Sequence, residues 1–134
     1  MLPGESRETA RAIFAETIRS AAASDPWLKE NPPELEWFEG QFESGETDMD
    51  DPIIELLGRS HREIVGKEAQ IEGVPYGSDL RLFTNHGQMP AILYGPGDVA
   101  NAHSVNEFVP LDEVIACTKI LALTIYRTCG GGGL

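Results

Sequence analysis

The sequence predicts a mixed α/β fold for this chain of 134 residues. Three stretches, residues 6–23, 52–65 and 110–129, carry apolar side chains at helical spacing, and short apolar or aromatic runs between them are typical of strands. Helical and strand patterns alternate along the chain, as expected of α/β proteins. The acidic stretch 43–51 has no apolar periodicity, so it divides a short first part from a longer second part.

The first part is predicted to contain one helix and one or two strands. Ser6 can cap a helix over residues 6–23, and the Asp25-Pro26 pair ends it. A strand is predicted over residues 35–42, because aromatic residues there alternate with glutamates, and aromatic residues on a pleated strand usually pack on one face. So short a segment can hardly bury a core alone. We therefore expect it to be part of a domain.

The second part is predicted to begin with a helix at Asp51-Pro52, since an acidic N-cap followed by proline is a strong helix start. This helix extends to about Val65. Residues 90–94 predict a buried strand that leads into a tight turn at residues 95–98. The last helix, residues 110–129, is apolar on most sides, so we expect it to be largely buried.

The charge of the chain excludes some classes of partner. It holds 22 acidic and 10 basic residues, a net charge of -12, of which residues 1–57 carry -10. Such a chain is repelled by nucleic-acid phosphates and by anionic membranes, so neither partner is expected. No stretch approaches the roughly 18 apolar residues of a membrane span, and the start has no signal-peptide pattern, which indicates a cytoplasmic protein.

The strongest chemical signal is the segment 94–110, where a predicted strand leads into a glycine-rich turn and then to His103. Loops at strand ends often hold ligands or catalytic groups. Glu107, four residues later, could hold one ring N–H of His103 while the other nitrogen binds a metal. Spacing alone leaves open that His103 is a hydrogen-bonded structural residue. His61 and His86 lack a second ligand at helical spacing, so we interpret them as structural or solvated.

These residues resemble a known family. The string GPGDxxxAHxxNExV at residues 95–109, with GSDLR at 77–81 and LPGE at 2–5, is similar to the C-terminal part of the zinc-dependent amidohydrolases. That family includes acetylornithine deacetylase, succinyl-diaminopimelate desuccinylase, aminoacylase and carboxypeptidase G. The resemblance implies a catalytic α/β domain with two zinc ions and an inserted lid, an α+β sandwich that mediates dimerisation. Residues 1–48 would be part of the lid, and residues 49–134 the C-terminal segment of the catalytic domain.

The resemblance also implies roles for particular residues. The family's other metal ligands, and the Glu-Glu pair that supplies the general base, lie upstream of the lid and are not in this sequence. One imidazole does not distinguish zinc from cobalt or manganese. The implied roles are metal ligand for His103, orientation of nearby groups for Glu107, and substrate binding for Gly77, Ser78, Asp79 and Gly97.

We therefore expect the C-terminal portion of a metal-dependent amidohydrolase that hydrolyses N-acyl amide or peptide bonds, acting on an N-acyl amino acid or a peptide. The isolated chain is expected to be inactive, because the base that activates the metal-bound water is missing. A homodimer would form through the lid. Two alternatives stay open: a non-catalytic dimerisation or binding module in which His103 is a relic, and a split enzyme completed by a separate N-terminal half.

Overall fold

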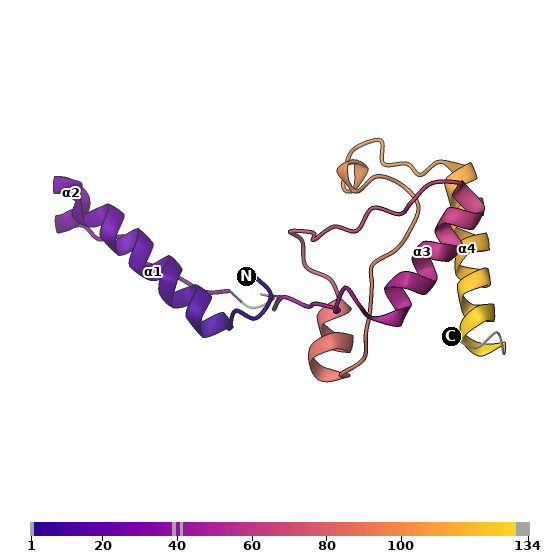
Figure 1. The fold of residues 1–134 in the computed structure, drawn as a ribbon. Coiled ribbons are helices and arrows are strands. Elements are labelled where there is room, and N and C mark those ends of the chain that lie inside the picture. Colours follow the sequence, from indigo (N-terminus) through magenta and orange to yellow (C-terminus); the bar gives the residue numbers. More distant parts are fainter. Residues whose placement is uncertain (1, 39, 41, 131–134) are drawn as a thin grey trace. The chain divides into compact units, whose positions relative to one another are not determined.

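Helices joined by extended and irregular segments make up the structure, a computed structural model that describes residues 2–38, 40 and 42–130. Figure 1 shows their order along the chain. The elements are α1 (Arg7–Ala23), α2 (Pro26–Glu30), α3 (Pro52–Val65), the π-helical turn η1 (Leu82–His86), the 3-10 turn η2 (Val99–Asn101) and α4 (Leu111–Cys129).

The chain divides into two compact units, each built from two separate stretches. Unit 1 contains the chain up to Glu46 together with Tyr76–Gly87, and unit 2 contains Thr47–Pro75 and the chain from Gln88 onward. The predicted domain boundary between residues 48 and 49 stays a prediction, as does the assignment of the first part to a lid.

The two helices at the start of unit 1 are both fixed by side-chain caps. The hydroxyl of Ser6 accepts a hydrogen bond from the N–H of Thr9 at 3.1 Å, which confirms the predicted start of α1. Helix α2 was not predicted. The carboxylate of Asp25 accepts two backbone N–H groups of its first turn at 2.9 Å, and Pro26 is its first residue. The Asp-Pro pair therefore begins a new helix instead of only ending α1.

The strand predicted over residues 35–42 does not form in its described residues, which are 35–38, 40 and 42. The segment packs on α1 through Trp37, whose ring meets Phe14 edge to face with the ring centroids 5.8 Å apart. The guanidinium of Arg11 lies over the same ring at 5.1 Å. A strand also needs a ladder of backbone hydrogen bonds to a neighbour. The expected aromatic packing is present here without such a ladder.

The strand predicted over residues 90–94 is also not formed. The backbone of Ala91 bonds to a side chain instead: its N–H donates to the hydroxyl oxygen of Thr47 at 3.0 Å, and its carbonyl accepts from the same hydroxyl. One side chain can satisfy one residue in this way, whereas a sheet needs a paired backbone. The predicted α/β class is therefore not confirmed, because the regular elements of the described residues are all helical.

Helix α3 has the predicted bounds. The carboxylate of Asp51 accepts the N–H of Ile53 at 2.9 Å, with Pro52 in the first turn. At its other end Gly66 adopts φ 77° and donates its N–H to the carbonyl of Arg62 at 2.8 Å. A glycine in this left-handed conformation is the common way to end a helix, because it costs no Cβ clash.

Helices α3 and α4 pack against each other and form the core of unit 2. Leu56 and Leu57 of α3 are buried, as are Cys117 and Ile120 of α4. Ile120 is 1% exposed, the lowest value among the buried apolar side chains of the described residues. The free energy that holds this helix pair together therefore depends strongly on a few apolar side chains.

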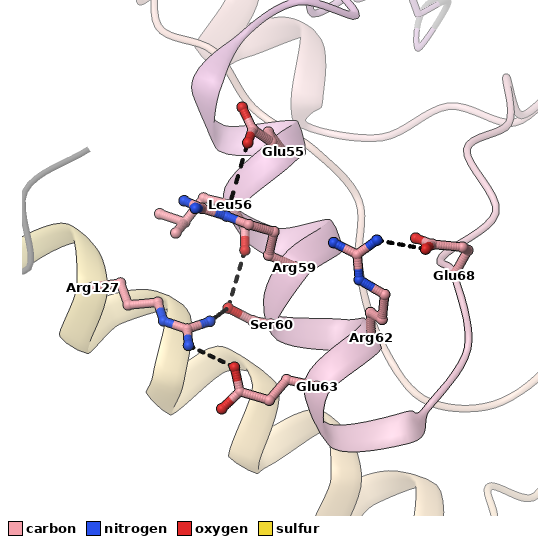
Figure 2. Close-up of polar contacts among 8 residues, drawn as sticks. All are labelled: Glu55, Leu56, Arg59, Ser60, Arg62, Glu63, Glu68 and Arg127. Carbon is pink, nitrogen blue, oxygen red and sulfur yellow. Dashed lines mark hydrogen bonds and ion pairs between the residues drawn. The ribbon is translucent and has the colours of Figure 1, made fainter.

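A polar network centred on the buried Ser60 joins the same two helices, as Figure 2 shows. The hydroxyl of Ser60 is fully buried, donates to the carbonyl of Leu56 at 3.0 Å and accepts from Arg127 at 3.2 Å. A second nitrogen of Arg127 lies 2.6 Å from the carboxylate of Glu63. Buried hydroxyls are tolerated when their hydrogen bonds are made. Arg127 thus satisfies Ser60 and ties the C-terminal turn of α4 to α3.

The expectation that the last helix is largely buried is wrong for the described structure. Only Cys117 and Ile120 of α4 are buried, while Leu111, Ile115 and Ile125 are exposed. The reason is that a single helix, α3, packs on α4 and covers one side. Among the described residues, no helix combines the length and apolar content that crossing a bilayer requires.

Candidate metal-ligand loop and pocket residues

The loop between residue 94 and α4 starts with a sharp turn in unit 2. Gly97 adopts φ 88°, and a Cβ at this position would come within 3.2 Å of a methyl of Val109. Both observations favour glycine, since L side chains rarely adopt such a φ. The carboxylate of Asp98 then accepts the N–H of Ala100 at 2.9 Å and caps η2. These turns lead the chain directly to His103.

His103 lies in a left-handed backbone conformation with an exposed side chain. Its φ is 62°, which is uncommon for a residue other than glycine. The carboxylate of Glu107 accepts the backbone N–H of His103 at 3.2 Å. Within residues 2–38, 40 and 42–130, the His103 imidazole has no hydrogen bond or ion pair. A neutral imidazole in this state has a free nitrogen lone pair, the group that binds a metal.

Glu107 lies beside His103, but through a different contact from the one expected. The sequence suggested that its carboxylate holds a ring N–H of His103, whereas the observed bond goes to the backbone N–H. The N–H of Glu107 in turn donates to the carbonyl of Ser104 at 3.3 Å. These bonds fix the backbone on both sides of His103 and leave its ring free. A contact between Glu107 and the ring in the metal-bound protein stays a prediction.

The predicted substrate-binding residues 77–79 form one bend in unit 1. A Cβ at Gly77 would lie 2.6 Å from the ring of Phe42, so only glycine fits without a shift. The hydroxyl of Ser78 accepts the N–H of Leu80 at 3.3 Å, and the carbonyl of Asp79 accepts the N–H of residue 82 at 2.8 Å, beginning η1. His103, Glu107 and Gly97 belong to unit 2. Substrate binding by residues 77–79 and Gly97 stays a prediction.

Arg81, just after this bend, was given no role from the sequence. Its guanidinium carbon lies 4.9 Å from the centre of the Phe42 ring. Its Nε is buried and has no hydrogen-bond partner among the described residues. Arginine donors suit carboxylates and other planar anions. The Arg81 guanidinium, beside the predicted substrate-binding residues 77–79, is therefore suited to bind an anionic group. The sequence feature that points to Arg81 is its position two residues after Asp79, in the same GSDLR motif.

The other two histidines have partners within their own units. The Nδ1 of His61 lies 2.7 Å from the hydroxyl of Tyr94, and the two rings meet edge to face. The Nε2 of His86 lies 4.0 Å from the carboxylate of Glu43 and its side chain is exposed. His61 thus makes a side-chain hydrogen bond, as a structural histidine does, and His86 is largely solvated.

Tyr94 gives a prediction about alkaline stability. Burial, and then the charge of nearby Cys117, raise the pKa of the Tyr94 phenol above its ordinary value of 10.0. The folded chain therefore keeps this proton at pH values where the unfolded chain releases it, so its stabilising contribution is complete below pH 10.0 and is lost as the pH rises through the raised pKa. We expect Tyr94→Phe to flatten the fall in unfolding free energy above that pH.

The matched control for this measurement is Tyr126→Phe, which removes an exposed phenol from α4. Urea unfolding followed by circular dichroism at several alkaline pH values measures both variants. His61, the hydrogen-bond partner of Tyr94, is unchanged in each variant. An unchanged slope in Tyr94→Phe would contradict the prediction.

The described residues do not form a complete metal site. No three His, Cys, Asp or Glu side chains gather among them in a group able to hold a metal ion. A catalytic zinc needs about three protein ligands and an open position. His103, whose ring is free and whose backbone is held by Glu107, fits the role of one such ligand.

Comparison with known sequences gives the class of protein. The profile of peptidase family M20/M25/M40 matches residues 7–127, which is most of the chain. The chain therefore belongs to this family. The matched region includes the His103 loop and the bend at residues 77–79.

Three curated relatives are similar over nearly the whole chain. The N-formyl-4-amino-5-aminomethyl-2-methylpyrimidine deformylases of Halalkalibacterium halodurans and Bacillus subtilis are each 30% identical, over 95% of this chain and 31% and 32% of their own lengths. The acetylornithine deacetylase of Myxococcus xanthus is 29% identical, over 97% of this chain and 31% of its own. The chain spans about a third of the length of these relatives. No solved structure matches the chain.

Proposed function

We propose that this chain is the C-terminal portion of a metal-dependent amidohydrolase that hydrolyses N-acyl amide or peptide bonds. Three observations support this. The chain belongs to family M20/M25/M40, which is generally metal-dependent. Its relatives are named as deformylases and a deacetylase. The segment most similar to the amidohydrolase motif forms an ordered loop with a free imidazole at residue 103.

The observation that carries the proposal is the state of His103. Its backbone is held by Glu107, while its exposed ring makes no hydrogen bond within the described part of the chain. A structural histidine is expected to use its ring, as His61 does with Tyr94. A metal-ligating histidine needs a ring nitrogen with a free lone pair, and it usually donates its other ring N–H to a carboxylate or a carbonyl. His103 has the free lone pair, and Glu107, four residues away, would accept the other ring N–H in the metal-bound protein.

In the complete enzyme, His103 would hold one of two metal ions, zinc or alternatively cobalt or manganese. When bound, the metal supplies a water of lowered pKa and polarises the scissile carbonyl. Glu107 fixes the backbone of His103. Residues 77–79 of unit 1 and Gly97 of unit 2 would each contact the substrate, an N-acyl amino acid or a peptide. The remaining ligands and the general base belong to the part of the enzyme outside this chain.

The same proposal assigns residues 1–48 to a lid that forms a homodimer and residues 49–134 to a catalytic α/β domain in the cytoplasm. The segments predicted as strands at 35–42 and 90–94 would then join sheets of the complete enzyme, where neighbouring strands supply the hydrogen-bond ladder. The exposed apolar side of α4 supports this reading, since large apolar side chains such as Leu111 and Ile125 are usually covered.

The test compares the recombinant chain of 134 residues with the natural protein, isolated with an antibody raised against this chain. Intact mass spectrometry measures the length of the natural polypeptide and of any subunit bound to it, and elemental analysis measures its metal. Hydrolysis is followed with N-formyl and N-acetyl amides. We expect the recombinant chain to be silent, and the natural protein to be longer or to have a second subunit, to hold metal and to be active.

Zinc-dependent hydrolysis by the recombinant chain alone would overturn the proposal that catalysis needs further residues. A natural protein without metal or hydrolytic activity would overturn the amidohydrolase proposal. A second subunit of separate origin would identify the split enzyme, because the mass then appears in two polypeptides.

A further inference from the structure

We infer that Glu113 is a positioning residue for the His103 loop, an inference that rests on the proposed role of His103 as a metal ligand. Glu113 lies in the first turn of α4, and its carboxylate accepts the backbone N–H of Gly97 at 2.8 Å. This bond joins the start of the loop to the helix that follows its end. All the groups involved belong to unit 2.

The local sequence explains why Glu113 is available for this contact. It is the third helical residue, and a glutamate there ordinarily reaches back to the backbone N–H of the N-cap residue. In α4 the N-cap is Pro110, which has no N–H and makes no side-chain cap. The carboxylate therefore has no partner at its own helix start, and it bonds to Gly97, which lies 16 positions earlier.

Val109 restricts which residue can occupy the same turn. A methyl of Val109, just before α4, lies close enough to Gly97 that a Cβ would come within 3.2 Å of it. Gly97 also has φ 88°, so its N–H points where few other residues could place it without strain. The base of the loop is thus closed by a hydrogen bond to a carboxylate, the stronger kind of hydrogen bond, at a position where glycine is favoured.

Between these two points the loop is held by short-range bonds of its own. The carboxylate of Asp98 caps η2, the hydroxyl of Ser104 donates to the carbonyl of Asn101 at 2.7 Å, and Glu107 accepts the N–H of His103. These bonds set the shape of the loop, but none of them reaches α3 or α4. Tyr94, where the loop begins, is attached to α3 by its hydrogen bond with His61. The bond between Gly97 and Glu113 adds the attachment to α4, closer to His103, and helps to fix where the loop stands on the helix pair.

The first experiment measures amide hydrogen exchange in the recombinant chain by NMR. Glu113→Ala should speed exchange at Gly97 and His103 at least about tenfold, because the base of the loop opens. Glu113→Gln keeps an acceptor oxygen and should restore most of the protection. Asp112→Ala is the matched control: it removes the neighbouring first-turn carboxylate, which has no hydrogen bond or ion pair in the described chain, and should leave both amides unchanged.

The second experiment measures zinc affinity of the complete natural protein by dialysis against buffered zinc and elemental analysis. Misplaced ligand geometry typically weakens metal binding about 10–100-fold, so Glu113→Ala should weaken it by at least about tenfold, with rescue by Glu113→Gln and no change in Asp112→Ala. Far-UV circular dichroism checks that each variant retains its helices. This readout does not depend on hydrolysis.

Several results would overturn the inference. One is unchanged amide exchange in Glu113→Ala, and another is an equal effect of Asp112→Ala, which would mean that only the charge at the helix start matters. A third is unchanged zinc affinity in Glu113→Ala where His103→Ala loses zinc, which rejects the positioning role and keeps the proposed function. If His103→Ala loses no zinc, the proposed function fails, whereas faster exchange in Glu113→Ala still shows the structural bond.

Discussion

Replacing Ile120 with alanine is expected to lower the free energy of unfolding of unit 2 by about 2–5 kcal/mol. Ile120 is 1% exposed and lies in the contact between α3 and α4. The substitution removes buried methyl and methylene groups and leaves a cavity that the two helices can close only partly. Because domains of this size are stable by only about 5–15 kcal/mol, a large part of the stability of the helix pair should be lost.

The matched control for this prediction is Ile125→Ala, the same substitution five positions later on the same helix. Ile125 is 62% exposed, so its removal should change stability by about 0.5 kcal/mol or less. Urea unfolding followed by far-UV circular dichroism measures both variants. Equal destabilisation by the two substitutions would mean that the contact between α3 and α4 does not determine the stability of the unit.

His103→Ala is expected to remove one metal ion from the complete natural protein and to lower its turnover at least about 100-fold, equivalent to about 2.7 kcal/mol of transition-state stabilisation. The substitution deletes the free imidazole and keeps the bond from Glu107, which goes to the backbone N–H. The shape of the loop should therefore persist while the ligand is lost. Elemental analysis and single-substrate kinetics measure the two effects.

His86→Ala serves as the control, because His86 is also exposed but lies in unit 1 beside Glu43. It should keep the metal content and the turnover of the unsubstituted protein. A His103→Ala protein with full metal content and full turnover would show that His103 does not bind the metal.

The helices were predictable from the sequence because their signals act over a few residues. Asp51 with Pro52 begins α3 and Gly66 ends it, and each of these residues acts within its own turn of helix. The same logic should have found α2, whose Asp25 and Pro26 repeat the arrangement. Pro26 fits the end of α1, and a proline also suits the first position of a new helix, here α2.

The strands could not be predicted in the same way, since a strand depends on a partner that is distant in sequence. The pattern at residues 90–94 describes which side chains are apolar, but it does not say what their backbone will meet. In the structure the backbone of Ala91 meets the side chain of Thr47. The exposure of α4 has a similar origin, because its apolar pattern says nothing about how many neighbours cover it.

For the candidate site, the motif around His103 indicated the residues and left their contacts undetermined. The proximity of Glu107 to His103 followed from their spacing, whereas the choice of backbone N–H over ring N–H depends on the left-handed conformation of His103. The contact between Glu113 and Gly97 spans 16 positions and depends on a proline N-cap, so no short motif could predict it.

The interleaving of the two units has a consequence for the order of events during synthesis. The two stretches of unit 1 are joined by the bond from the side chain of Asn85 to the carbonyl of Ser44 at 2.9 Å, among other contacts, and the whole of α3 is translated between these two residues. Contacts that are distant in sequence form slowly, because a long loop must close first. In a nascent chain, the first stretch of unit 1 therefore lacks its second stretch until residue 87 has emerged from the ribosome. Unit 2 is completed last, when Arg127 reaches Ser60 and Glu63.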